Sequence, residues 1–448
     1  MAKKKPIAIL ALLLSFTLLL AACGQGGNNT PTTGAAGTDS SKSPGEKIKL
    51  SIWHNFSGDD LRAKVVREQI EKFQSEHPEV ELDAQAIPPD GYRQRLKTVA
   101  AANEMPDVFF VQSGTSIKEF YDGGLIQPIT SVLDEHPDWK NNFISGSLDT
   151  LSFDGQVYAT PLSGSATSFL FYNKSLFEKY GVKVPTTWDE MMTAVKTFND
   201  NKITPISLGN KASWLAQSSI LSSLADRVTG TDWFLKAVNQ DGAKFTDPEF
   251  VQALQYFKDL ADANAFQTGF NSLDNTQMEQ YFAEGKAAMM IDGSWALTNM
   301  AAAATEEQLS QIDITVLPSV PGGKGDPNSM SGGSGGGLAL SKTVTGDKLK
   351  AALDLIYTVS GPEAMQAIAD SNSIVTYKVE PDQSKVMPLF YKAFTLYKSL
   401  SLTPVYDAYL TSSATDAVNN GLQEVSLGGD PKAIAQKIQD AQARDLGK

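Results

Sequence analysis

Hydrophobic side chains between residues 48 and 111 alternate between two spacings, and this restricts the possible folds more than any other feature of the chain. Apolar residues at every second position are typical of strands, whereas a repeat of three or four positions is typical of an amphipathic helix. The order strand, helix, strand, helix, strand predicts an α/β fold with a parallel sheet covered by helices. The predicted strands lie at 48–53, 80–86 and 107–111, and the predicted helices at 61–73 and 92–100.

The rest of the chain is predicted to be richer in helix. Thr187 and Glu190 have the spacing of a capping box, and Asp247-Pro248 is typical of a helix start. The sequence contains no internal repeat. We further predict a helix at 278–282 followed by a strand at 287–291, a loop-rich stretch at 318–337, and helices at 387–400 and 431–444.

The composition excludes several classes of protein. The 448 residues include 38 Lys and Arg against 51 Asp and Glu, a formal net charge of −13, with no long basic block. Nucleic-acid binding is therefore not expected, because its affinity comes mainly from cationic side chains on phosphates. One Cys and three His exclude an intrachain disulfide framework and argue against a multi-ligand zinc site. We expect no metal and no cofactor.

The N-terminus has the features of a secretory signal. Three lysines precede an uncharged stretch at 7–22, which is shorter than the roughly 20 apolar residues of a membrane span. The sequence Leu-Ala-Ala-Cys that ends at Cys23 resembles the bacterial lipobox, in which cleavage precedes a cysteine that then carries lipid. Cys23 is also the single cysteine of the chain. We expect a lipoprotein signal peptide at 1–22, a lipidated Cys23 with a flexible tether over 23–46, and an extracytoplasmic location at the cell membrane.

One catalytic motif occurs, and its surroundings do not fit the mechanism. Gly332 to Gly336 match G-x-S-x-G, but a nucleophile elbow needs a strand–turn–helix and a histidine base. Here a strand pattern follows the motif, and the three histidines precede it. His77 and His136 each precede a proline and are expected at helix ends or on the surface. We do not expect an enzyme, although 51 acidic residues leave a carboxylate pair of the glycosidase type open.

Tryptophan is scarce, which makes the position of each ring informative. The faces of carbohydrate rings stack on aromatic side chains, but a given Trp more commonly packs in a core. Trp53 lies within a predicted strand and Trp188 at a helix start, so both are expected to pack. Trp214 and Trp295 adjoin polar stretches with Gly or Ser and are better candidates for ligand contact.

Four segments occur together in a family-specific order. They are Pro106-Asp107-Val108; Tyr158 to Glu190, which includes Tyr-Asn-Lys-Ser-Leu-Phe and Pro-Thr-Thr-Trp-Asp-Glu; Phe282 to Trp295, which includes Gly-Lys-Ala-Ala-Met and Gly-Ser-Trp; and the Gly-rich 318–340. With the lipobox they cover nearly the whole chain. The sequence resembles the family 1 extracellular solute-binding proteins of ABC importers, the relatives of maltodextrin-binding protein.

This resemblance implies a type II periplasmic-binding-protein-like fold. Such a fold has two α/β lobes, each a mostly parallel sheet flanked by helices, with the ligand cleft between them. The chain would cross between the lobes three times. The resemblance maps the N-lobe to 46–160 plus 322–376 and the C-lobe to 161–321 plus 377–448.

The implied function is capture of a carbohydrate, with an oligosaccharide as the first expectation, by hinge closure. The sugar would pass to the permease subunits of an ABC transporter, and the receptor would be a monomer. The alternatives are the same fold with a polyol, glycerol phosphodiester or peptide as ligand, and a secreted carbohydrate-active enzyme.

The resemblance also implies positions for the ligand-binding residues. Loops after the first and third strands would contribute polar side chains, the two tryptophans would stack, and glycines would let the backbone approach the sugar. Neither an aromatic nor an acid follows the third strand, so a maltodextrin is not the expected ligand. The residues mapped to the ligand are His54, Asn55, Gln112, Ser113, Trp214, Trp295, Gly332, Gly333 and Tyr406.

Overall fold

A computed structural model describes residues 47–144 and 147–448. The predicted signal peptide, Cys23 and the predicted tether lie outside the described residues. Within the described part of the chain, no helix is both long and apolar enough to cross a membrane.

The first sheet confirms the predicted strand–helix alternation. β1 (Ile48–His54) pairs in parallel with β2 (Val80–Ala86) and β3 (Val108–Val111). The connections are α1 (Leu61–Glu76) and α2 (Pro89–Ala101), and Asp60 caps α1 by accepting from Ala63 N. The strand order is β13-β12-β3-β1-β2, with β4 and β7 also paired to β12.

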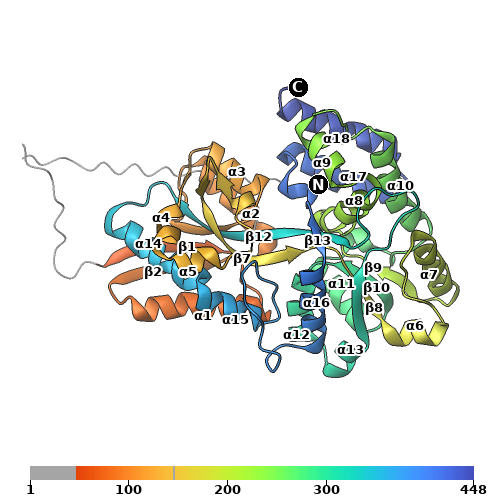
Figure 1. The fold of residues 1–448 in the computed structure, drawn as a ribbon, viewed down its shortest axis with the longest axis horizontal. Coiled ribbons are helices and arrows are strands. Elements are labelled where there is room, and N and C mark those ends of the chain that lie inside the picture. Colours follow the sequence, from red (N-terminus) through yellow and green to blue (C-terminus); the bar gives the residue numbers. More distant parts are fainter. Residues whose placement is uncertain (1–46, 145–146) are drawn as a thin grey trace, which may run out of the picture. The chain divides into compact units, whose positions relative to one another are not determined.

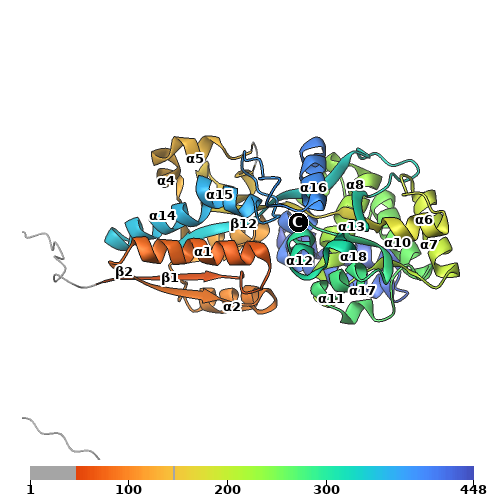
Figure 2. The same cartoon turned by 90° about the horizontal axis from the view of Figure 1, so that it is seen from below.

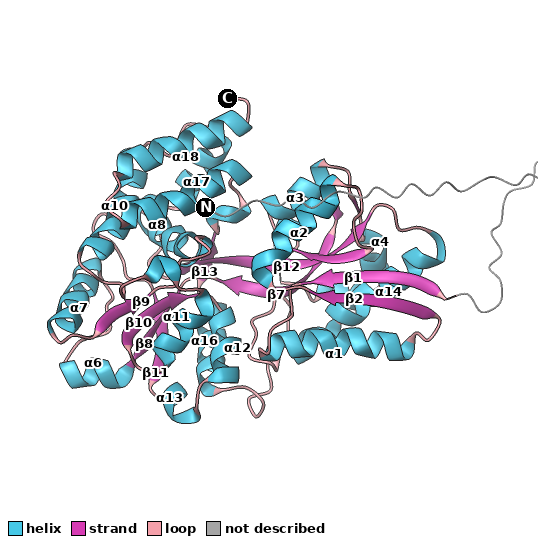
Figure 3. Ribbon diagram, turned by 180° about the vertical axis from the view of Figure 1, so that it is seen from behind, coloured by secondary structure: helices cyan, strands magenta, loops and turns pink. Residues whose placement is uncertain are grey.

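Further elements complete the region around this sheet (Figures 1 and 3). They are α3 (Thr115–Asp122), β4 (Ile126–Gln127), α4 (Thr130–Glu135), α5 (Pro137–Asn141), η1 (Asp149–Leu151), β5 (Ser152–Phe153), β6 (Gln156–Val157), β7 (Ala159–Ala166), β12 (Ser329–Ser341), α14 (Gly346–Ser360), α15 (Pro362–Ala369) and β13 (Ser401–Thr403).

The second sheet is mixed. Its order is β11-β8-β10-β9, and β8 runs antiparallel to both of its neighbours while β10 and β9 are parallel. Its strands are β8 (Phe169–Asn173), β9 (Thr204–Ser207), β10 (Ala287–Asp292) and β11 (Ile312–Val316).

Helices surround the second sheet, and the predicted ones are confirmed. The capping box of Thr187 and Glu190 is present at the start of α7, and Pro248 opens α10. The helices are α6 (Lys174–Tyr180), α7 (Trp188–Asp200), η2 (Ala216–Leu221), α8 (Ser222–Thr229), α9 (Thr231–Asn239), α10 (Pro248–Asp262), η3 (Phe270–Ser272), α11 (Asn275–Ala283), α12 (Trp295–Ala303), α13 (Glu306–Ser310), α16 (Pro388–Ser399), η4 (Tyr406–Ala408), α17 (Ser412–Ser426) and α18 (Pro431–Asp445).

Buried apolar side chains form two separate cores. The first core surrounds the first sheet and the second core surrounds the second sheet; we call the elements around them the first and second lobes. Membership changes between Leu162 and Ala166, between Met330 and Leu338, and again between Tyr377 and Val386. Strands β7 and β12 therefore run from one lobe into the other, as Figure 2 also shows for β12.

The glycine-rich stretch before Leu338 is a strand where the sequence predicted a loop. β12 begins at Ser329 and pairs antiparallel with β7. A Cβ on Gly332 would lie 2.4 Å from Ser165 O, so the two backbones are too close for a side chain at this position. The G-x-S-x-G match thus lies inside a strand, and the Ser334 hydroxyl donates to the Ser147 carbonyl.

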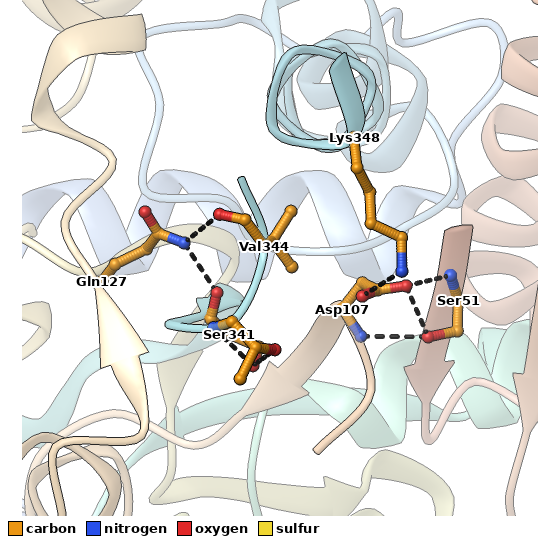
Figure 4. Close-up of polar contacts among 7 residues, drawn as sticks. Ser51, Asp107, Gln127, Ser341, Val344 and Lys348 are labelled. Carbon is orange, nitrogen blue, oxygen red and sulfur yellow. Dashed lines mark hydrogen bonds and ion pairs between the residues drawn. The ribbon is translucent and has the colours of Figure 1, made fainter. Parts of the chain in front are cut away.

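Hydrogen bonds of Asp107, which precedes β3, link β3 to two other strands of the first sheet (Figure 4). Its carboxylate accepts from Ser51 N at 2.8 Å and Ser51 Oγ at 3.0 Å, and it pairs with Lys348 Nζ at 2.8 Å. Its carbonyl accepts from Ser341 N at 2.8 Å. Ser341 O also accepts from Gln127 Nε2 at 2.7 Å, so β1, β3, β4 and β12 share one polar network.

We predict that Asp107→Ala lowers the free energy of unfolding by about 1–3 kcal/mol, because it leaves the partly buried N and Oγ donors of Ser51 without their acceptor. Urea and thermal unfolding of the purified protein measure this. Asp134→Ala is the control, since that side chain is 59% exposed and its ion pair with Lys140 lies at the surface; its expected cost is below about 1 kcal/mol. Equal effects of the two variants would contradict this role of Asp107.

Candidate ligand-binding site

Two loops that carry predicted site residues leave the carboxyl ends of the parallel strands β1 and β3. This end of an open α/β sheet is where ligands bind. Tyr92 holds the two strand ends together, because its hydroxyl lies 2.6 Å from Phe110 O and 3.1 Å from Trp53 O. The loops after His54 and Val111 are therefore neighbours on one edge of the first lobe.

His54 shapes the first of these loops from inside. It is 2% exposed, and its Nδ1 accepts from Phe56 N at 3.2 Å. Burial, together with the charge of Arg67, lowers the pKa of His54 to about 4, so the ring is neutral at physiological pH. Arg67 Nη1 donates to Phe56 O at 2.7 Å and Gly58 O at 2.9 Å, which fixes the path of the loop into α1.

The same loop presents polar atoms without partners. Asn55 Oδ1 and Arg62 Nε are both buried and make no hydrogen bond. The Arg62 guanidinium lies 5.4 Å from the centroid of the Phe56 ring. Buried polar atoms in native proteins nearly always bind protein, water or ligand. This part of the first lobe therefore offers an unused acceptor and an unused donor.

The loop after β3 meets the second lobe. Gln112 is half-buried, and Ser113 Oγ donates to Ser334 O of β12 at 2.5 Å. Gly114 packs so closely that a Cβ there would lie 2.1 Å from Ala408 O. Thr115 Oγ1 donates to Leu410 O at 2.6 Å. Ser113 thus binds the strand that joins the lobes, and α3 begins against the second lobe.

The two candidate tryptophans contact each other in the second lobe. Their ring centroids are 5.4 Å apart with an interplanar angle of 66°, and both rings are half-buried. Trp295 Nε1 is buried without a hydrogen-bond partner. Trp295 starts α12, and α12 contacts α1 of the first lobe. Trp295, one member of the edge-to-face pair, therefore lies on the helix that contacts α1 of the first lobe.

Two acids behind Trp295 were not predicted from the sequence. Glu279 on α11 is 2% exposed, and Asp292 at the end of β10 is fully buried. Arg62 was missed as well, since a charged residue in a helix's first turn is ordinarily solvent-exposed. In the sequence, the one feature that could have pointed to Asp292 is its position next to the glycine turn that carries Trp295.

The remaining predicted residues are two glycines of β12 and a tyrosine of the second core. Gly332 meets the backbone of β7, and a Cβ on Gly333 would have no neighbour within 4 Å. Tyr406 is 1% exposed in the second core and stacks on Phe234 at 4.0 Å between centroids. The ring of Tyr406 is therefore covered on both faces by protein, because aromatic packing in this core continues from Phe234 to Phe250.

A separate hollow lies in the first lobe. It has a volume of about 530 Å³ and contains none of the predicted site residues. The residues that line the hollow are Tyr121, Asp122, Gly124, Ile126, Gln127, Pro128, Tyr158 and Lys342.

Among the described residues, no group of three His, Cys, Asp or Glu is arranged to hold a metal ion.

Comparison with known proteins identifies relatives over most of the chain. The Multiple sugar-binding protein of Streptococcus mutans is 25% identical over 399 residues, 87% of each chain. The polygalacturonan/rhamnogalacturonan-binding protein of Bacillus subtilis is 25% identical over 366 residues, 77% of this chain and 68% of the relative. An ABC transporter extracellular-binding protein of Pyrococcus horikoshii is 24% identical over 300 residues, and the chain spans 64% of that relative's length.

Solved structures share the fold. One from work on xylan utilization by Caldanaerobius polysaccharolyticus superposes with a TM-score of 0.80 at 28% identity, covering 88% of this chain and 99% of the other. A chitin oligosaccharide binding protein gives a TM-score of 0.81 at 24% identity, covering 89% and 100%. These neighbours confirm the predicted two-lobed, type II periplasmic-binding-protein-like fold. The family model for bacterial extracellular solute-binding proteins matches residues 59–366, and the chain belongs to that family.

Proposed function

We propose that this protein is the carbohydrate-binding receptor of an ABC importer. One observation carries the proposal: the half-buried pair Trp214 and Trp295 lies on the lobe opposite the unpaired atoms of Asn55 and Arg62. Aromatic faces stack on the apolar faces of sugar rings, and convergent donors and acceptors bind hydroxyls. A site with these two features suits a ligand that is apolar on its faces and polar at its edges.

The relatives support a sugar as the ligand. Their names specify multiple sugars, polygalacturonan and rhamnogalacturonan, and, for a Pyrococcus abyssi protein, maltotriose. All of these are named as binding proteins and none as an enzyme. We propose that this chain likewise binds without turnover and releases its sugar to permease subunits.

Closure of the two lobes is the proposed means of capture. Thr115 Oγ1 of the first lobe donates a hydrogen bond to Leu410 O of the second lobe. Strands β7 and β12 connect the two lobes. A ligand that contacts both lobes stabilises the closed arrangement by its differential affinity for that state. The bend would lie where β7 and β12 pass between the cores.

A thermal-shift screen of residues 46–448 tests the proposal. The sugars are xylo-, chito-, malto- and galacturonic-acid oligosaccharides, together with stachyose. A sugar at about 100 times its Kd adds roughly 2.7 kcal/mol of stability and raises the melting temperature. A hit with one class, without hydrolysis products by chromatography, is the expected result. No shift with any sugar would reject a carbohydrate ligand and favour a polyol, phosphodiester or peptide.

Trp295→Ala is expected to weaken binding of that sugar by about 1–3 kcal/mol, or roughly 5- to 150-fold in Kd, through lost aromatic burial. Isothermal titration calorimetry measures the change. Tyr121→Ala is the matched control, because it removes an aromatic ring from the hollow in the first lobe. Weaker binding by the control alone would place the sugar in that hollow instead.

We also propose that Cys23 carries the lipid that holds the protein at the cell membrane. Cys23→Ser is expected to abolish metabolic labelling with palmitate and to release the protein into the medium. The wild-type chain, expressed in parallel, is the control. Membrane retention and labelling that both survive the substitution would contradict this anchor.

A further inference from the structure

Two carboxyl groups lie side by side beneath the turn that carries Trp295. Glu279 is 2% exposed and Asp292 is fully buried. Asn299 Nδ2 donates to both oxygens of Glu279 at 3.0 and 2.8 Å. Asn275 Nδ2 and Gly293 N each donate to Asp292 at 2.8 Å. Among the described residues, neither acid forms an ion pair with Lys, Arg or His.

Two buried carboxylates without a cation are strongly unfavourable, so the pair must hold a proton. Burial raises the pKa of Glu279 well above its ordinary value, and the neighbouring charge of Asp292 raises it further. Burial also raises the pKa of Asp292, whereas donors around it, Glu279 among them, oppose that rise. Of the two acids, Glu279 is therefore the one that favours the protonated form more strongly.

Asp292 positions the turn to Trp295. It accepts from Gly293 N, and a Cβ on Gly293 would lie 2.2 Å from Cη2 of the Trp295 ring. Ser294 N donates to Ala166 O at 2.7 Å, which ties the turn to the end of β7. The indole lies close enough to lower the pKa of Asp292, although its Nε1 makes no hydrogen bond of ordinary geometry.

The first lobe adds a charge to this arrangement. Asp60, the cap of α1, acts on Glu279 and also raises its pKa. The groups that face the pair thus come from four elements: Asn275 on α11, Trp295 and Asn299 on α12, Gly293 after β10, and Asp60 before α1.

We propose that Glu279 and Asp292 form a proton-holding pair that positions Trp295, so that loss of the proton displaces the ring and weakens ligand binding. The inference rests on the proposed function, because it assigns a role to Trp295 in the site. Glu279 is a positioning residue: it acts on the ligand through Asp292 and Trp295.

The test compares Glu279→Gln with Glu284→Gln. Glutamine at 279 keeps a donor toward Asp292 and cannot lose a proton. Glu284 ends the same helix, is 49% exposed and pairs with Lys286 at the surface, so its variant makes the same Glu-to-Gln exchange at a solvent-exposed carboxylate. Folding raises the pKa of the Glu279 carboxyl above its ordinary value of 4.5. The stability that this group contributes to the fold is therefore fully present below pH 4.5 and is lost as the pH rises through the raised pKa.

Melting temperature from about pH 5 to about pH 9 is the first readout. We expect it to fall with pH in the wild type and in Glu284→Gln, and to fall less than half as far in Glu279→Gln. The second readout is the fluorescence of Trp295, taken as the difference with and without Trp295→Phe in each background. Its pH-dependent change should disappear in Glu279→Gln. Identical pH profiles in all three proteins would overturn the proposal.

Ligand binding is the third readout, with the sugar identified by the thermal-shift screen. Its Kd should rise about fivefold across this pH range in the wild type and less than twofold in Glu279→Gln. Absence of binding to any sugar at any pH would reject the receptor function, while the fluorescence readout still decides the role of the pair. If Glu279→Gln does not fold, the infrared band of a protonated carboxylic acid in the wild type at neutral pH decides, and its absence overturns the proposal.

Discussion

The close pairing of β7 with β12 is the constraint on which the two-lobed structure depends. These strands belong to both cores, so their register fixes one lobe against the other. A buried cluster of hydroxyls locks the second-lobe end: Ser331 Oγ lies within 2.6 to 2.9 Å of the hydroxyls of Thr167, Ser168 and Ser223. Arg227 donates to the backbone of Ser329 and Asp326 just before it. Beyond this anchor the register shifts between Ser334 and Gly337, which is where the ladder is least regular.

The proposed ligand site is built from groups whose hydrogen-bonding capacity is only partly used. His54, Arg67 and Tyr92 are satisfied and hold the first-lobe loops in place. Asn55 and Arg62 each retain a buried polar atom without a hydrogen-bond partner. An unsatisfied buried group lowers stability, since it has lost water without gaining a protein partner. A ligand that supplies the missing hydrogen-bond partners removes this cost. The satisfied residues thus hold the loops in place, and the unsatisfied atoms remain for the ligand to bind.

Local pattern was sufficient to predict the first five elements of the first lobe, from β1 to β3. The spacing of apolar residues from Ile48 to Val111 located its parallel strands, and the Thr187 capping box located α7. The glycine-rich part of β12 was missed because it has no apolar alternation; it is extended only because β7 lies beside it. Trp214 and Trp295 were identified by their polar neighbours, whereas Tyr406 was proposed from the family resemblance and lies in a core. Burial of Tyr406 is set by Phe234 and Phe250, which are distant in sequence.

The discontinuous first lobe has a consequence for biosynthesis. During translation β3 emerges early, and all four of its residues are buried in the finished sheet. Its antiparallel neighbour β12 ends only at Ser341, after most of the second lobe has been made. Until then β3 has β1 on one side and an open apolar edge on the other, which is a template for aggregation. The order of synthesis thus leaves this edge uncovered until about three quarters of the chain has been made.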